Sequence, residues 1–263
     1  MGSRNNLIWK LVKKVYNFSR KLGLDPLPMW SFIRFGKRYV RDYMKFQKEG
    51  GVITDRYPIL VDMLDEAGVA NGHYFHQDLL VASRIFQANP RKHIDVGSSI
   101  NGFVAHVASF RKISIFDIRP LKIDAHQNIE FTQIDFQNGS DLPTEICDSI
   151  SCLHAIEHFG LGRYGDPIDP LGHIKGLNNL YSLLEPGGTL YISCPIGSSN
   201  QVHFNAHRVF EPTGILNWAP NLSLKLVRFD FVDDFGDLHQ GLPSETPNLE
   251  FGLGIYEFLK TSN

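Results

Sequence analysis

Histidine and acidic residues concentrate after position 153 of this 263-residue sequence. The run His154-x-x-Glu157-His158 opens the cluster, directly after an apolar segment typical of a buried strand. A neutral imidazole can remove a hydroxyl proton near pH 7, and a carboxylate can orient the imidazole or hold a divalent ion against vicinal hydroxyls. The pattern therefore predicts proton transfer from a hydroxyl-bearing substrate.

His158 is our preferred general base, with Glu157 as the orienting carboxylate and His154, His173 and His207 as alternative bases. Nearby polar side chains are candidates for binding the substrate, because arginine can grip an anionic sugar or phosphate through two parallel hydrogen bonds. These candidates are Arg163, Tyr164, Asp166, Asp169, Asn205 and Arg208. Asp-Pro pairs are also typical of turns, and individual histidines are often structural, so only the cluster as a whole indicates a site.

The same run also matches the H-x-x-E-H pattern of one class of zinc protease. That pattern requires a helix that carries both histidines, whereas here the segment directly follows a predicted strand. The protease hypothesis is therefore disfavoured. A divalent ion remains an option, and no metal site is predicted.

Residues 92–110 contain the elements that must position this cluster. His93–Val96 suits the end of a buried strand, Gly97-Ser98-Ser99 a tight turn, and apolar residues recur at helical spacing after Gly102. Glycine permits a sharp turn and close approach to a ligand, and a helix N-terminus presents free N–H groups. We expect half of a nucleotide-binding βαβ unit here, with ligand contacts from Asp95, Gly97, Ser98 and Ser99.

Two later strands add candidate ligand contacts. Asp117 ends a predicted strand at 113–117 and lies 22 residues after Asp95, close to the ~20-residue interval at which a carboxylate meets ribose hydroxyls in dinucleotide folds. Ile118 follows it. A third strand at 130–134 leads to Asp135 and Phe136, which are suited to flank an adenine.

The remaining pattern completes an α/β sheet. We expect strands at 148–153 and 189–194 joined by a helix at 174–184, and mostly helical structure over 52–91, where His73 and Tyr74 can roof a cofactor pocket. Residues 222–232 and 249–259 alternate apolar and polar side chains, which predicts a hairpin at the sheet edge.

The front of the chain differs in charge from the rest. Residues 1–50 hold twelve Lys and Arg against three Asp and Glu, whereas the whole chain has a net charge of −2. Apolar residues recur at helical spacing over 7–22, and a second basic, aromatic segment spans 30–48. This helical extension either contacts an anionic membrane surface or packs as a cap on the remaining domain.

Composition limits the cell compartment. The cysteines at 147, 152 and 194 lie in or beside strand-like runs and lack metal-type spacing, as expected of reduced thiols in a cytosolic protein. No apolar run approaches the ~20 residues that span a bilayer, and no signal peptide is evident. We expect a cytoplasmic protein, peripheral at the inner face of the membrane if residues 1–50 bind lipid. The basic segment lacks a nucleic-acid reader motif, so no nucleic-acid partner is expected.

The order of elements and the residues at the strand ends resemble class I S-adenosylmethionine-dependent methyltransferases from about residue 78 to 260. The family's acid-x-Gly-x-Gly-x-Gly loop aligns with the run from Asp95, with Ser99 and Asn101 in place of the second and third glycines. More narrowly, IDVGSS, FDIRP, HAIEHFGLGRYGDPIDP and FNAHRVF resemble the domain of unknown function 268 family, which is associated with this fold and, in bacteria, with surface polysaccharides.

The resemblance implies a Rossmann-like sheet of parallel strands with a C-terminal antiparallel hairpin over 51–263, behind a basic helical extension at 1–50. It implies S-adenosylmethionine as the cofactor, with Asp117 at the ribose, Asp135 and Phe136 at the adenine, and His154 beside the cofactor. The expected activity is O-methylation of a sugar or glycolipid in surface-polysaccharide biosynthesis. A non-methyl transferase, for example one dependent on a nucleotide-sugar, and a non-catalytic binding module remain alternatives, because the glycine loop is altered and fold alone does not select a reaction.

Overall fold

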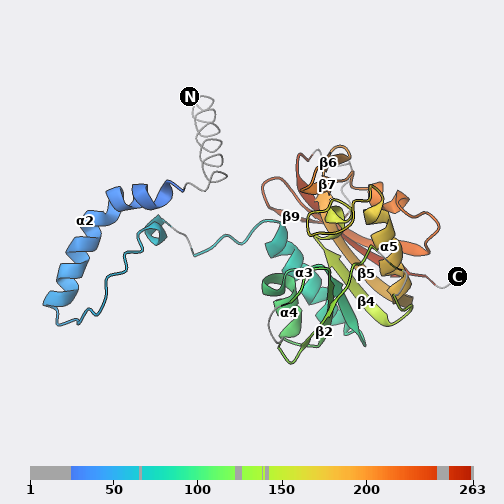
Figure 1. Cartoon of the computed structure of the whole chain (residues 1–263), viewed down its shortest axis with the longest axis horizontal. Helices are drawn as coiled ribbons and strands as arrows, with labels where there is room; N and C mark the ends of the chain where they lie inside the picture. The colour runs from blue at the N-terminus through green and yellow to red at the C-terminus, as the bar shows by residue number, and fades with distance from the viewer. Residues whose placement is uncertain are drawn as a thin grey trace. The chain divides into compact units, whose positions relative to one another are not determined.

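The computed structural model of the chain describes residues 25–64, 67–121, 126–137, 139, 142–241 and 249–261 (Figure 1). It divides into two compact units, residues 1–69 and 70–263, whereas the sequence-based boundary lay between residues 50 and 51. The helix predicted at 7–22 falls outside the described residues. Within the described part of the chain, no helix has both the length and the apolar character needed to cross a membrane.

The first unit contains one long helix, α2 (Leu27–Lys48). Pro28 occupies its first turn, where a missing N–H removes no helical hydrogen bond, and Gly50, at φ +92°, follows its end. The predicted helical structure over 52–72 is wrong: within the described residues only the short turn η1 (Val61–Leu64) is helical. Pro58, Gly68 and Gly72 interrupt this segment, and proline and glycine both disfavour a helix interior.

The second unit is built on an eight-stranded sheet. Its five parallel strands are β1 (His93–Val96), β2 (Ile113–Asp117), β3 (Ile129–Gln133), β4 (Cys147–Leu153) and β5 (Leu184–Ile196). The strand order is β3-β2-β1-β4-β5-β10-β8-β9. Parallel pairing aligns Val96 of β1 with Phe116 of β2, so the carboxyl ends of these strands meet at one edge. The predicted parallel sheet is confirmed.

The predicted hairpin is confirmed as the antiparallel end of the sheet. β8 (Leu224–Val232) and β9 (Leu238–Gln240) lie beyond β10 (Gly252–Lys260), which pairs antiparallel with both β5 and β8. A small separate ribbon, β6 (Gln201–His203) and β7 (His207–Val209), follows β5, and the turn η5 (Gly214–Asn217) leads on to β8.

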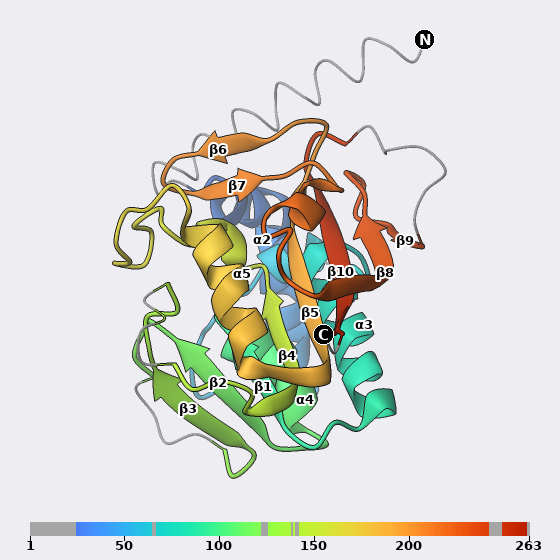
Figure 2. The same cartoon turned by 90° about the vertical axis from the view of Figure 1, so that its right-hand side faces the viewer.

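Helices cover both faces of this sheet (Figure 2). α3 (His73–Ala88) and α4 (Ala105–Ala108) pack on one face, where Val81, Ile85 and Val107 join a buried cluster. α5 (Gly172–Leu183) packs on the other face through Leu177 and Leu180. No α-helix joins β2 to β3 or β3 to β4 within the described residues.

A buried arginine ties α3 to the antiparallel strands. Arg84 on α3 pairs with Asp230 of β8 at 2.5 Å and lies 3.6 Å from Glu257 of β10. Arg84 and Asp230 are both buried. Removing one partner of a buried ion pair leaves an uncompensated charge in a poorly solvated site.

We therefore expect Arg84→Ala to lower the free energy of unfolding by about 3–5 kcal/mol. The exposed pair Lys112–Glu130 provides the control, because Lys112→Ala should cost less than about 1 kcal/mol. Urea unfolding followed by circular dichroism measures both. Equal losses for the two variants would contradict a structural role for the buried pair.

Candidate functional site

A cavity of about 630 Å³ opens where β1, β2 and β4 end. The first turn after β1 lines one side of it, and the segment after β4, including the helical turn η4 (Ile156–His158), lines the other. A second cavity of about 60 Å³ adjoins it at the end of β3. The predicted cofactor and base residues Gly97, Ser99, Asp117, Glu157 and His158 therefore share one space.

The turn after β1 is held by a buried carboxylate. Asp95 Oδ1 accepts hydrogen bonds from the hydroxyls of Ser98 (2.8 Å) and Ser151 (2.5 Å), and its Oδ2 accepts one from the backbone N–H of Ser98 (3.1 Å). Burial raises the pKa of Asp95 to about 7, against the opposing effect of these donors. Asp95 lines neither cavity. Its role is to join β1, the turn and β4, and this corrects the prediction of a direct cofactor contact.

Gly97 brings the backbone to the cavity wall. Its φ is +81°, its N–H donates to the Phe116 carbonyl (2.9 Å), and a Cβ added there would lie 2.8 Å from the Cβ of Ala155. Only glycine fits this conformation and this close approach. Ser98, Ser99 and Asn101 line the same wall, so the two non-glycine residues of the loop still face the cavity.

Arg119 spans the distance between Asp117 and Gly97. Its Nε and Nη2 donate to the two oxygens of Asp117 (2.9 and 2.5 Å), and Nη2 also donates to the Gly97 carbonyl (3.3 Å). The guanidinium lies 4.7 Å from the centre of the Tyr164 ring. In this conformation Asp117 is engaged by Arg119 at the atoms that would meet ribose hydroxyls. The Arg119 side chain is 44% exposed, so it can turn away at small energetic cost.

The small cavity contains the residues predicted at an adenine. Ile118, Asp135 and Phe136 line it, and Asp135 Oδ1 accepts the N–H of Gln137 (3.0 Å). Phe136 is buried and packs near Phe116. The three residues therefore meet beside Asp117, as the strand ends indicated.

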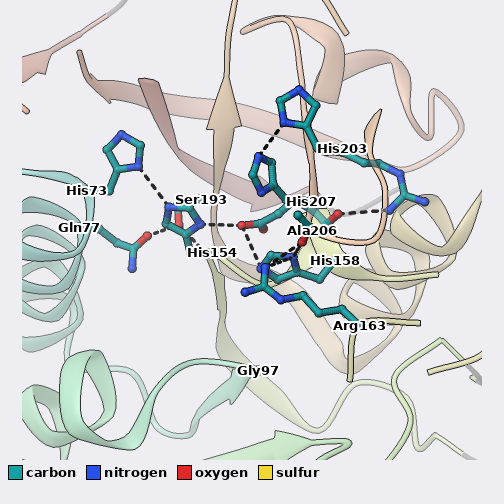
Figure 3. Close-up of polar contacts among 12 residues, drawn as sticks. His73, Gln77, Gly97, His154, His158, Arg163, Ser193, His203, Ala206 and His207 are labelled. Atoms are coloured by element: carbon teal, nitrogen blue, oxygen red, sulfur yellow. Dashed lines mark hydrogen bonds and ion pairs between the residues drawn. The ribbon is translucent and has the colours of Figure 1, made fainter. Parts of the chain in front are cut away.

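A chain of hydrogen bonds crosses the other side of the large cavity (Figure 3). His73 Nδ1 lies 3.2 Å from His154 Nε2, and His154 Nδ1 lies 2.6 Å from Glu157 Oε1. Burial lowers the pKa of His73 to about 4, and the neighbouring His154 lowers it further. Both ring nitrogens of His154 are thus engaged, which leaves it poorly placed to accept a substrate proton.

His158 has a different hydrogen-bonding state. Its Nδ1 lies 2.7 Å from the carbonyl oxygen of Ala206, so Nδ1 carries the proton and Nε2 is left with its lone pair. That Nε2 lies 3.6 Å from Glu157 Oε1. Burial lowers the pKa of His158, while Glu157 opposes this effect. The geometry suits a neutral base whose protonated form a carboxylate stabilises.

Glu157 is fully buried beneath both histidines. Burial by itself would raise its pKa, but the charge and hydrogen bond of His154 hold the pKa of Glu157 below its usual value. Its Oε2 has no hydrogen-bond partner among the described residues. The carboxylate is therefore ionised and only partly satisfied, a state that an adjacent imidazolium would relieve.

Arg163, Tyr164 and His207 also line the cavity. Arg163 Nη1 donates to the Ala206 carbonyl (2.8 Å), and its guanidinium lies 5.3 Å from the centre of the Tyr164 ring. His207 lies near Phe251 and within 3.2 Å of His203. Burial lowers the pKa of His207, so neutral His207 is an available but less constrained second base.

Four predicted residues pack against, or form hydrogen bonds or ion pairs with, other parts of the chain. The ring of His173 packs against Phe210 and Trp218, and the buried Arg208 donates to the carbonyls of Glu157 and Phe159. Asp166 accepts N–H groups of its own loop and lines the small cavity, and Asp169 pairs with Lys175 (2.5 Å). These contacts disfavour the expected roles of His173, Arg208 and Asp169, whereas the substrate-binding role of Asp166 stays a prediction. Asn205 is exposed between β6 and β7 and lines neither cavity.

Some groups that line or support the cavity were not predicted from the sequence. Arg119 lies in the FDIRP motif, yet nothing in the sequence indicated that it would reach back to Gly97. The Ala206 carbonyl that fixes His158 is a backbone atom, which carries no sequence signal. Gln77, by contrast, belongs to the helix start that the sequence placed over the pocket, and it accepts a hydrogen bond from the Ser193 hydroxyl that joins α3 to β5 beneath His154. His73 and Tyr74 do line the cavity, as their position before the first strand suggested.

No cluster of three or more potential metal ligands occurs among the described residues. His154 has a left-handed backbone at φ +53°, and His158 lies on the single helical turn that follows. The two histidines therefore do not share a helix as the zinc-protease pattern requires.

The assignment of His173 can be tested through pH. Burial lowers its pKa to about 4 from 6.5, and the charge of Arg208 adds to this. The unfolded chain thus takes up the proton first, so the stabilisation from the neutral ring is complete above pH 6.5 and is lost as the pH falls toward 4. We expect His173→Phe to reduce the difference in the free energy of unfolding between pH 7.5 and pH 5, measured by urea unfolding. Turnover should not change. A large loss of turnover would restore a catalytic role.

Solved structures resemble this chain in fold. The [4+2]-cyclase SpnF has a TM-score of 0.51 at 12% identity, covering 78% of this chain and 83% of that chain. The N-methyltransferase NodS from Bradyrhizobium japonicum, in complex with S-adenosylhomocysteine, has a TM-score of 0.47 at 12% identity, covering 73% and 89%. The Burkholderia thailandensis 1,6-didemethyltoxoflavin-N1-methyltransferase, with its substrate and S-adenosylhomocysteine, has a TM-score of 0.49 at 15% identity, covering 87% and 90%.

At 12% identity the likeness to SpnF, whose TM-score exceeds 0.5, concerns the fold alone. A comparison with curated proteins finds no match. A family model described as Caenorhabditis protein of unknown function, DUF268, matches residues 104–243, which is more than half of the sequence. This match includes the strand ends β2 to β5 and the histidine cluster. The chain therefore belongs to the DUF268 family.

Proposed function

We propose that this protein is an S-adenosylmethionine-dependent O-methyltransferase. The observation that carries the proposal is the single cavity of about 630 Å³, in which the Gly97 turn and Asp117 lie opposite His158. One wall suits an adenosyl cofactor, and the other offers a base with a free lone pair. A methyl donor and a hydroxyl acceptor need this juxtaposition.

The residues present fit the cofactor. Gly97 leaves room for close approach, Asp117 offers two carboxylate oxygens to a ribose once Arg119 turns away, and Ile118, Asp135 and Phe136 form a narrow slot for an adenine. S-adenosylmethionine has no phosphate, so a loop with Ser99 and Asn101 in place of glycines is sufficient. When bound, it supplies an electrophilic methyl group.

The chain's own part in the reaction is proton transfer and orientation. His158 Nε2 accepts the proton of the acceptor hydroxyl, while its Nδ1–H remains on the Ala206 carbonyl. Glu157 lies 3.6 Å away and stabilises the imidazolium that forms. The hydrogen bonds from His73 through His154 to Glu157 fix that carboxylate in place.

The acceptor is a sugar or glycolipid in our proposal, at the cytoplasmic face of the membrane. Two features support it: the bacterial association of the family with surface polysaccharides, and the cation Arg163 beside Tyr164 at the cavity wall. Aromatic faces and a bidentate cation suit the apolar face and carboxylate of an acidic sugar. Arg208, which donates to backbone carbonyls, takes no part.

Arg119 favours a second candidate. Because its guanidinium engages Asp117 and the Gly97 carbonyl, the ribose position is filled by the chain itself. A non-methyl transferase, for example one dependent on a nucleotide-sugar, could bind phosphate through Arg119 at this position instead. A non-catalytic binding module would keep the ion pair between Arg119 and Asp117 intact at all times.

Calorimetry with S-adenosylmethionine and S-adenosylhomocysteine separates these candidates. We expect micromolar binding, weakened about 10-fold or more by Asp117→Asn, since hydrogen bonds to a charged group are lost. Arg119→Gln should tighten binding roughly two- to fivefold, because the ribose no longer competes with the partly exposed Arg119 guanidinium for Asp117. Asp237→Asn makes the same chemical change on an exposed turn and should have no effect. No heat from the wild type and from Arg119→Gln would favour the second candidate.

The base assignment predicts a loss of turnover with intact cofactor binding. His158→Ala should lower kcat by about 10²- to 10⁴-fold, the usual range for a general base, in assays of S-adenosylhomocysteine release with neutral and acidic sugars. Because burial lowers the pKa of His158, the wild-type rate should fall only below pH 6.5 as the imidazole becomes protonated. His173→Phe serves as the control. Unchanged turnover in His158→Ala would transfer the role to His207.

A further inference from the structure

Helix α2 separates apolar from cationic side chains on two opposite faces. In a projection at about 100° per residue, nine of its apolar and aromatic side chains fill one arc of about 180°, whereas Leu27 and Trp30 fall among the cations. The nine are Met29, Phe32, Ile33, Phe35, Tyr39, Val40, Tyr43, Met44 and Phe46. Its six cations fill an arc of about 100° on the other side, namely Arg34, Lys37, Arg38, Arg41, Lys45 and Lys48.

The apolar arc is accessible to solvent. Six of its side chains are 49–74% exposed: Met29, Phe32, Ile33, Val40, Met44 and Phe46. A contiguous patch of large aliphatic and aromatic side chains is costly in water and marks an interaction surface rather than an ordinary exterior. The face therefore requires an apolar partner.

The cationic arc is only partly neutralised. Asp42 is the single acidic residue of α2 and is shared by Arg38 (3.4 Å) and Arg41 (3.2 Å), while Lys45 pairs with Glu49 (3.8 Å). Among the described residues, Arg34, Lys37 and Lys48 have no carboxylate within 4.0 Å. The Arg34 guanidinium instead lies 5.1 Å from the ring centre of Trp30, which falls within the cationic arc.

We propose that α2 lies flat in the headgroup region of a bilayer that contains anionic lipids. A bilayer surface offers acyl chains to the apolar arc and negative headgroups to the cations along the same length, about 33 Å for 22 residues. Nucleic acid would neutralise the cations but would leave the aliphatic arc in water. Six cations also prevent α2 from spanning the bilayer.

The inference is independent of the proposed reaction. α2 ends at Lys48, well before the family match begins at residue 104, and it contributes no residue to either cavity. If the reaction is the one proposed, the helix would hold the enzyme near a lipid-linked acceptor. Lipid binding is nonetheless measured without cofactor or acceptor.

Flotation of the full chain with two kinds of vesicle tests the proposal at about 0.1 M salt. We expect the protein to float with phosphatidylcholine–phosphatidylglycerol vesicles and to stay in the bottom fraction with pure phosphatidylcholine. Arg34→Glu, Lys37→Glu and Arg41→Glu combined should lower the bound fraction at least about 10-fold. Ile33→Ser, Val40→Ser and Met44→Ser combined should lower it similarly, since the apolar arc is then lost.

A matched control reverses three exposed cations of the second unit, Lys112, Lys225 and Arg228. This variant has the same net charge as the α2 reversal and should float like the wild type. Flotation that is unaffected by both α2 variants would overturn the proposal and assign binding to another segment. Absence of wild-type flotation, with crosslinks from α2 to residues 70–263, would overturn it in favour of a cap on the chain's own second unit.

Discussion

The Glu157 carboxylate has lost all contact with solvent, and the functional side of the molecule is arranged to support its charge. A buried carboxylate stays ionised only if cations or donors surround it. His154 supplies a hydrogen bond at 2.6 Å, His73 supports His154 from α3, and His158 faces the same oxygen at 3.6 Å. The segment after β4, the start of α3 and the β6–β7 ribbon are held together by this one charge and its partners.

The two sides of the cavity differ in rigidity. The side formed by the segment after β4 is buried: Glu157 lies beneath the histidines, and His158 is fixed by a backbone carbonyl. The side formed by the turns after β1 and β2 has an adjustable element, because the partly exposed Arg119 side chain contacts Asp117, the Gly97 carbonyl and the Tyr164 ring. A ligand at Asp117 can therefore displace Arg119 without disturbing His158. In our proposal, this movement accompanies entry of the cofactor.

The fold leaves the reaction open. A similar structure with a TM-score above 0.5 is named a cyclase, so the Rossmann-like sheet provides a platform and the side chains after its strands determine the chemistry. In this chain those side chains include an imidazole with a fixed tautomer, which favours proton abstraction from a hydroxyl. The amphipathic helix α2 adds a separate surface outside the matched family region, which in our proposal binds lipid.

Local sequence patterns were sufficient to predict the strands of the sheet and the edge at which they end. Strand ends at Val96, Asp117 and Leu153 follow from apolar runs broken by turn residues, and parallel strands necessarily bring their carboxyl ends to one edge. The meeting of Gly97, Asp117 and the His154–His158 segment could thus be predicted. The hairpin at 224–260 could be predicted equally well, because alternation of apolar and polar residues with a period of two is typical of a half-buried strand.

The assignment of individual roles required the tertiary structure. Asp95 and Asp117 look alike in sequence, yet Asp95 is buried under two serine hydroxyls and Asp117 is held by Arg119. His158 has a carbonyl acceptor at Nδ1 and Glu157 near Nε2, whereas the ring of His173 packs against Phe210 and Trp218. Such partners come from residues distant in the chain, and the protonation state of a side chain depends on those partners. The sequence alone determined where the ionisable groups gather, and the packing of distant segments decided which of them can act.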